Sequence, residues 1–220
     1  MRNPSPLTRT RRAALRASAR LRAAGCPPAP SAPDHLTAAL AERAPRLASH
    51  HAAVAQLAAA VAAVLGMRGA QLHEVVRAAE VHDVGKVAVP DSILNKRGAL
   101  TDDELEVMRR HTIVGERILV AGAESRRIAA IVRSSHERWD GTGYPDRLRG
   151  DDIPLGARII TICDAYDAMT HARPYRPARP VPDALDELRR GAGRRYDPDL
   201  VAVFLAAVTA LGGPAVRPPR

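Results

Sequence analysis

Apolar residues recur at intervals of three and four along most of the chain, the spacing that places side chains on one face of an α-helix. In the segment 71–82, for example, the apolar face consists of Leu72, Val75, Val76 and Ala79. The same spacing and its stop signals predict helices over 36–44, 46–65, 71–82, 101–119, 128–137, 154–170, 182–190 and 198–211. No alternating run is long enough to predict a β-strand. We therefore expect an all-α bundle of about seven or eight helices.

Capping residues, glycines and prolines mark where these helices begin and end. Thr101-Asp102-Asp103-Glu104 has the pattern of a capping box, in which the Thr hydroxyl and the Glu carboxylate bond to free backbone amides. Between Trp139 and Pro154 the glycines and prolines interrupt the helical pattern. This stretch is expected to form a structured loop.

The composition of the chain changes near residue 34. Residues 1–33 are rich in Arg, Ala, Ser and Pro, which cannot bury enough apolar surface to fold, so a disordered extension is expected there. Residues 34–212 carry the helical pattern and are expected to form one domain, followed by a frayed tail over 213–220. The longest apolar stretch, Ala52–Leu65, is shorter than the ~20 residues that cross a bilayer, so no membrane span is expected.

The net charge of +9 lies mostly in the first segment. Seven arginines precede Asp34, and without them 26 basic side chains face 24 acidic ones. The domain itself is nearly neutral, which argues against a nucleic-acid partner, although the arginine-rich segment could anchor on nucleic acid or acidic lipid. No apolar run typical of a secretory signal is present, so a cytoplasmic protein is expected. Cys26 and Cys163 lack the spacing of a disulfide scaffold or a zinc finger.

The most informative local motif is His82-Asp83-Val84-Gly85-Lys86, at the end of a predicted helix. An imidazole and a carboxylate side by side can share a cation, and the two carboxylate oxygens could bridge two metal ions. The glycine permits a tight turn, and the lysine offers an ammonium to a phosphate oxygen. Taken alone, an adjacent His and Asp is better explained as a structural pair.

Four further residues change this interpretation, because each lies on or beside the apolar face of a different predicted helix: His50, His111, His136 and Asp164. Any one of these histidines alone is better explained as a hydrogen-bonded core residue. However, a carboxylate that faces a core is costly unless it is paired or bound to a metal. Facing helices of a bundle commonly hold metal sites. Together, these residues and the His-Asp pair favour a metal centre in the bundle interior.

The order of the motifs resembles that of the HD-GYP subgroup of the HD-domain metal-dependent phosphohydrolases. The resemblance begins with H-D-x-G-K at 82–86, P-D-x-I-L at 90–94 and M-x-x-H-T at 108–112. It continues with H-E-R-W-D-G-T-G-Y-P at 136–145, I-P-L-x-A-R-I at 153–159, D-x-Y-D-A-M-T at 164–170 and R-P-Y-R at 173–176. Members of the subgroup are typically cyclic di-GMP phosphodiesterases with two or three metal ions, often iron or manganese.

The resemblance implies an HD-domain helical bundle with a Gly/Pro-rich GYP loop. It implies metal-assisted hydrolysis of cyclic di-GMP to linear pGpG, or onward to GMP. The implied cofactors are two divalent transition-metal ions, Fe or Mn. The resemblance also leaves room for a regulatory protein that binds the GYP loop and for a homodimer.

Carried over position by position, the resemblance assigns metal binding to His50, His82, Asp83, His111, His136 and Asp164. Asp83 would bridge the ions and Lys86 would lie near the scissile phosphate, so these two are the expected catalytic residues. Substrate binding is assigned to Lys86, Tyr144, Arg173 and Arg176. His51 is the alternative to His50, and because adjacent helical residues point about 100° apart, only one of the two is expected to serve.

Three positions depart from the subgroup. Ser135 stands where a second adjacent histidine is usual, and a hydroxyl binds transition metals far more weakly than an imidazole. Arg46 replaces a glutamate of three-metal members, and Ala53 replaces an arginine. We therefore expect two ions at most, with a weakened second site.

These departures keep open a domain that binds cyclic di-GMP or a partner protein without turnover. A phosphohydrolase for another nucleotide is a third alternative, but the intact G-Y-P sequence at 143–145 argues against it. Within the same loop, Tyr144 could pack rather than act on substrate. Trp139 could either stack on a guanine or anchor the loop.

Overall fold

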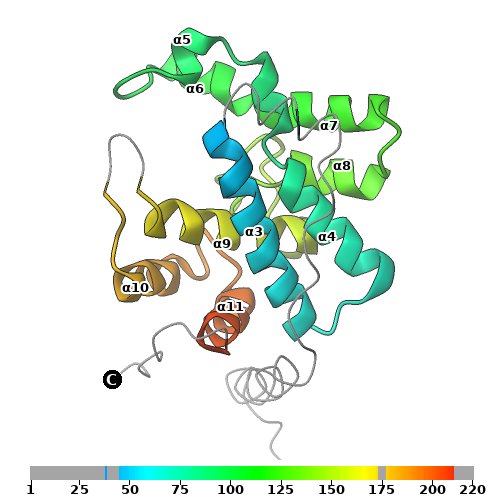
Figure 1. The fold of residues 1–220 in the computed structure, drawn as a ribbon, viewed down its shortest axis with the longest axis vertical. Coiled ribbons are helices and arrows are strands. Elements are labelled where there is room, and N and C mark those ends of the chain that lie inside the picture. The colour runs from blue at the N-terminus through cyan, green and yellow to red at the C-terminus, as the bar shows by residue number, and fades with distance from the viewer. Residues whose placement is uncertain (1–37, 39–44, 173–176, 211–220) are drawn as a thin grey trace, which may run out of the picture.

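A computed structural model of the chain describes residue 38 and residues 45–172 and 177–210 (Figure 1). Within these ranges the α-helices are α3 (Pro45–Val64), α4 (Gly69–Val81), α5 (Asp91–Leu94), α6 (Asp102–Arg109), α7 (His111–Ala121), α8 (Arg126–Arg133), α9 (Leu155–Thr170), α10 (Val181–Gly191) and α11 (Pro198–Ala210). Two short 3₁₀ segments, η1 (Val84–Ala88) and η2 (Gly150–Asp152), complete the structure, and no β-strand occurs in the described ranges. The all-α prediction is confirmed. The helix expected over 36–44 falls, except for residue 38, outside the described residues, as do the two expected tails.

Helix α3 runs through the middle of the bundle and packs against α4, α9 and α11 (Figure 1). The core between them is aliphatic, and Phe204 is the largest fully buried side chain among the described residues. Both α3 and α4 bury alanines, including Ala58 and Ala62 on α3 and Ala78 and Ala79 on α4. Such small side chains let the two helices approach closely, which brings the start of α3 and the end of α4 together.

The break between α6 and α7 differs from the single helix expected over 101–119. The capping box at Thr101 and Glu104 is present, but the helix stops at Arg109 and a new one starts at His111. The cause is a local side-chain contact. The His111 ring donates from Nδ1 to the Met108 carbonyl oxygen at 2.7 Å, and this bond competes with the backbone bonds of a continuous helix. The break places His111 at the beginning of α7.

Helix α8 also ends earlier than expected, at Arg133 rather than at residue 137. The Ser135 hydroxyl donates to the Val132 carbonyl oxygen at 2.9 Å, and a side chain that bonds to a backbone carbonyl competes with the helix. His136 therefore lies in the turn after α8, not on a helix.

Among the described helices, none has the length and apolar character needed to cross a membrane.

Candidate metal centre

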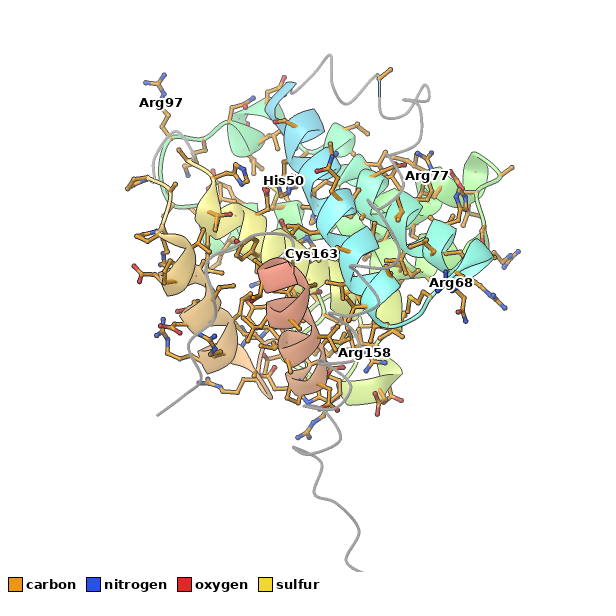
Figure 2. The ribbon with its side chains drawn as sticks, turned by 60° about the horizontal axis from the view of Figure 1, so that its bottom comes forward. His50, Arg68, Arg77, Arg97, Arg158 and Cys163 are labelled. Carbon is orange, nitrogen blue, oxygen red and sulfur yellow. The ribbon has the colours of Figure 1, made fainter. Side chains whose placement is uncertain are left out.

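The six residues expected to bind metal come from five segments of the chain. His50 lies on α3, His111 on α7 and Asp164 on α9. The other three follow helix ends: His82 and Asp83 come after α4, and His136 comes after α8. The expectation that helices carry all the surrounding ligands is thus wrong for His136. Figure 2 shows His50 near the beginning of α3, at the opposite end of that helix from Arg68.

The first group of candidate ligands consists of His50, His82 and Asp83. One donor atom from each lies within 4.8 Å of the others. Asp164 joins this group from α9, since its Oδ1 is 3.1 Å from His50 Nε2. This group therefore combines two imidazoles with two carboxylates.

The second group consists of Asp83, His111 and His136, again with donor atoms within 4.8 Å of one another. Asp83 belongs to both groups. Its Oδ1 is 3.4 Å from His111 Nε2, whereas its Oδ2 is 3.6 Å from His82 Nε2. The two oxygens of one buried carboxylate thus face different groups, as a bridging ligand requires.

Backbone contacts set the orientation of two of these rings. His82 Nδ1 donates to the Ala79 carbonyl oxygen at 2.8 Å, as His111 Nδ1 does to Met108. A ring whose Nδ1 carries the proton leaves the lone pair of Nε2 free for a metal ion. In both rings it is Nε2 that faces Asp83.

Asp167 is a site residue that sequence reasoning did not single out. Its Oδ2 accepts a hydrogen bond from His50 Nδ1 at 2.5 Å, and its side chain is buried. Despite the opposing effect of burial, the carboxylates of Asp164 and Asp167 raise the pKa of His50 to about 9. The signal was available, because Asp167 follows Asp164 by three positions and so shares its face of α9.

The donor atoms themselves fit a metal ion. Among the described residues, buried side-chain atoms without a hydrogen-bond partner include His51 Nε2, His82 Nε2, Asp83 Oδ1, His111 Nε2 and His136 Nε2. A buried polar atom left unpaired costs about 1–3 kcal/mol, so such atoms are rare in a folded protein. Their convergence on a shared carboxylate indicates a place for cations.

Burial and charge keep three of the candidate ligands, Asp83, His111 and His136, in metal-binding protonation states. Burial alone would raise the pKa of Asp83, but Lys86 and the neighbouring histidines outweigh it and hold that pKa well below its usual range. Burial lowers the pKa of His136 to about 4 and also lowers that of His111. Asp83 is therefore ionised and the two histidines are neutral near pH 7.

His51 also reaches this cluster, contrary to the expectation that only one of the adjacent histidines could. Its side chain is buried, and its ring centroid lies 5.6 Å from that of His50 and 4.9 Å from that of His82. The 100° separation of adjacent helical positions therefore does not keep either ring away from the cluster.

Two glycines bring backbones into direct contact around the centre. A Cβ on Gly85 would lie 1.9 Å from the His111 carbonyl oxygen and 2.6 Å from the Gly115 nitrogen, so η1 packs directly on α7. A Cβ on Gly143 would lie 2.4 Å from the Arg138 nitrogen. The latter contact holds the Gly/Pro-rich loop against the segment that carries His136.

Of the expected substrate-binding residues, Lys86 and Tyr144 lie at the centre. Lys86 Nζ is 2.6 Å from Asp83 Oδ2, and the Tyr144 ring stacks on His136 with centroids 5.2 Å apart. Arg173 and Arg176 fall outside the described residues.

A surface cavity of about 550 Å³ opens beside Tyr144. Its lining includes the arginines Arg109, Arg110 and Arg147, and the Arg109 guanidinium lies over the Tyr144 ring at 5.6 Å. Three arginines against one acidic lining residue, Glu106, make this cavity suited to an anionic ligand.

Trp139 anchors the loop. Its backbone amide donates to the Arg195 carbonyl at 3.3 Å, its carbonyl accepts from the Gly150 amide at 3.0 Å, and the Arg158 guanidinium lies 5.6 Å from its ring. Arg158 in turn donates to Asp197 at 2.8 Å. These contacts favour the anchoring interpretation over guanine stacking.

Comparison with known proteins identifies the relatives of this chain. Residues 34–200 match the sequence model of the family described as HD domain. The chain is 43% identical over 155 residues to the cyclic di-GMP phosphodiesterase response regulator RpfG of Xanthomonas campestris, covering 69% of this chain and 41% of that protein. It is 39% identical over 158 residues to a cyclic di-GMP phosphodiesterase of Thermotoga maritima, covering 71% of this chain and 43% of that protein. The chain thus spans less than half the length of these two relatives.

Solved structures share the fold. The HD domain of the Listeria monocytogenes phosphodiesterase PgpH, in complex with cyclic di-AMP, superposes with a TM-score of 0.60 at 20% identity, over 81% of this chain and 96% of that one. The cyclic GMP-AMP-specific phosphodiesterase V-cGAP3 of Vibrio cholerae gives a TM-score of 0.60 at 20% identity, over 79% of this chain and 47% of that one.

Proposed function

This chain belongs to the HD domain family, and from that premise we propose that it is a metal-dependent phosphodiesterase that hydrolyses cyclic di-GMP to linear pGpG, or onward to GMP. The observation that carries the proposal is Asp83, one buried carboxylate shared by two groups of candidate ligands in which His82, His111 and His136 each have a buried, unpaired Nε2. The names of the two curated relatives support cyclic di-GMP as the substrate.

In this proposal two divalent ions bind at the centre. His50, His82, Asp83 and Asp164 would hold the first ion. Asp83, His111 and His136 would hold the second. Mixed imidazole and carboxylate donors suit Fe and Mn. Bound ions of this kind supply Lewis acidity, which lowers the pKa of water and polarises a phosphoryl oxygen.

The chain's own residues orient the substrate and offset its charge. Lys86, with a side chain 22% exposed beside Asp83, can reach a phosphate oxygen and stabilise the negative charge that builds up there. The cavity beside Tyr144 is large enough for a nucleotide base, and its arginines can pair with a phosphate. Arg173 and Arg176 remain predicted substrate contacts.

A second candidate function is binding of the cyclic dinucleotide without turnover. Ser135 favours this candidate. Its hydroxyl donates to the Val132 carbonyl oxygen, so the second group of candidate ligands has only the two imidazoles of His111 and His136. A weakly bound second ion would reduce hydrolysis more than binding.

Purified protein, loaded anaerobically with Mn²⁺ or Fe²⁺, tests the proposal by chromatography of its products from cyclic di-GMP and 3′3′-cGAMP. We expect linear product from cyclic di-GMP. Lys86→Met should keep the metal content and lower turnover by about 10²–10³-fold, the usual cost of one lost charge-stabilising group. Lys96→Met is the matched control, since Lys96 forms a similar 2.6 Å ion pair with Glu104 away from the centre. Dinucleotide binding without any product would refute hydrolysis and support the second candidate.

A further inference from the structure

His51 has the same environment as the expected metal ligands. The residue is 5% exposed, and its Nε2 is buried without a hydrogen-bond partner, as are the Nε2 atoms of His82 and His111. We propose that His51 is an additional nitrogen ligand of the first metal ion, acting together with His50 rather than in its place. This inference rests on the proposed metal-dependent function.

The distances around Asp83 support this assignment. His51 Nε2 lies 3.6 Å from Asp83 Oδ2, the same separation that His82 Nε2 has from that oxygen. Two ligands of one ion, each bonded at about 2.1 Å, lie roughly 3.0–3.4 Å apart in octahedral or tetrahedral coordination. A small adjustment would therefore bring both nitrogens into the coordination shell of an ion that also contacts Asp83.

The competing explanation is a structural hydrogen bond from His51 to Asp83. At 3.6 Å the contact is too long for one, and Lys86 Nζ already occupies the same oxygen at 2.6 Å. A histidine kept for structure alone would be expected to satisfy its buried nitrogen, because an unpaired one destabilises the fold. A ligand, in contrast, keeps its lone pair free until the ion arrives.

The assignment changes the balance between the two sites. With His51, the first group contains three imidazoles and two carboxylates, whereas the second contains two imidazoles and the shared Asp83. We therefore expect one tightly held ion and one weakly held ion.

Metal binding, measured separately from catalysis, tests the assignment. The first equivalent of Mn²⁺ or Co²⁺ is titrated calorimetrically into chelator-treated protein, and the metal-induced shift of the melting temperature is recorded. His51→Leu should weaken binding of the first ion at least 10–100-fold, as loss of a metal-supporting group does. The metal-free variant should melt no lower than wild type, because a buried unpaired nitrogen has been removed. His73→Leu, which changes an exposed histidine on α4, is the matched control.

A second variant separates ligation from packing. His51→Gln keeps a polar side chain that can donate to Asp83, but an amide binds transition metals more weakly than an imidazole. A ligand role predicts that Gln fails to restore metal affinity. The assignment is overturned if His51→Leu binds the first ion with wild-type affinity, or if His51→Gln does so while His51→Leu does not. Either result leaves the proposed function intact. A wild-type protein that binds neither metal would overturn the proposed function as well.

Discussion

Replacing Gly85 with alanine should separate the two halves of the metal centre. A Cβ at this position would meet the backbone of α7 at 1.9 Å and 2.6 Å, where ordinary contacts begin at 3.4 Å. The atoms it meets are the His111 carbonyl oxygen and the Gly115 nitrogen, and neither can move as a flexible side chain could. Segment η1 must therefore shift by about 1.5 Å from α7.

The shift has a cost that can be estimated. Overpacking a tight contact costs about 1–3 kcal/mol, and the backbone partners place Gly85→Ala near the upper end. For a domain of this size, about 3 kcal/mol lowers the melting temperature by roughly 6–12 °C. The shift also draws Asp83 away from His111, whose donor atoms now lie 3.4 Å apart, so the second ion should be lost first.

Thermal melting of the metal-free protein and metal analysis per chain after equilibration with Mn²⁺ measure both effects. Gly122→Ala, directly after α7, is the control, because its Cβ would meet carbonyl oxygens of α7 at 3.4 Å and 3.7 Å, which are ordinary contacts. A melting temperature within about 2 °C of this control would mean an overpacking cost under about 1 kcal/mol. If Gly85→Ala shows such a melting temperature and binds as many ions per chain as the control, the packing argument is refuted.

Three further predictions concern the metal and the protons that compete with it. Asp167→Asn should lower the affinity for the first ion about 10–100-fold in calorimetric titration, because the carboxylate that orients His50 is lost. An unchanged affinity would contradict this. Adding Mn²⁺ to chelator-treated protein should raise the melting temperature, by an amount equivalent to about 2.7 kcal/mol at a hundredfold excess over Kd, and a melting temperature insensitive to metal counts against the centre. The free energy of unfolding of the metal-free protein should fall as pH drops from about 6.5 to about 4, because His51 and His136 have folded-state pKa values near 4 and the unfolded chain binds their protons first. The raised pKa of His50 has the opposite effect in another pH range, because it makes the free energy of unfolding fall as pH rises from 6.5 to about 9. A free energy of unfolding that does not change between pH 6.5 and 4 would refute the lowered pKa values of His51 and His136.

Periodicity located most helices correctly but missed their ends at the functional site. The helix through 101–119 breaks because the His111 side chain bonds to the Met108 carbonyl, and α8 stops early because Ser135 bonds to Val132. Hydrophobic spacing contains no information on such side-chain competition for backbone groups. It therefore placed His136 on a helix, although the residue lies in a turn.

The chemistry of the side chains predicts most of the residues that cluster at the candidate centre, and the exceptions have physical reasons. The sequence pattern indicates Asp164 as a carboxylate facing the core, but it does not indicate Asp167, which lies on the same face of α9 and bonds to His50. The argument that only one of His50 and His51 serves rests on backbone direction and does not include how far an imidazole reaches. Side-chain length decides such cases, and a helical-wheel argument does not include it.

The hydrogen bond between His50 and Asp167 joins positions 117 residues apart. Bringing such distant parts of a chain together carries an entropy cost that grows only slowly with the length of the closed loop, but it must be met before either end gains a contact. The helical hairpin of α3 and α4 can form from neighbouring sequence, whereas this link must wait for α9. In the proposed metal centre, full coordination of the first ion would therefore require α9 to be folded in place, because Asp164 and the Asp167 carboxylate that orients His50 both lie on that helix.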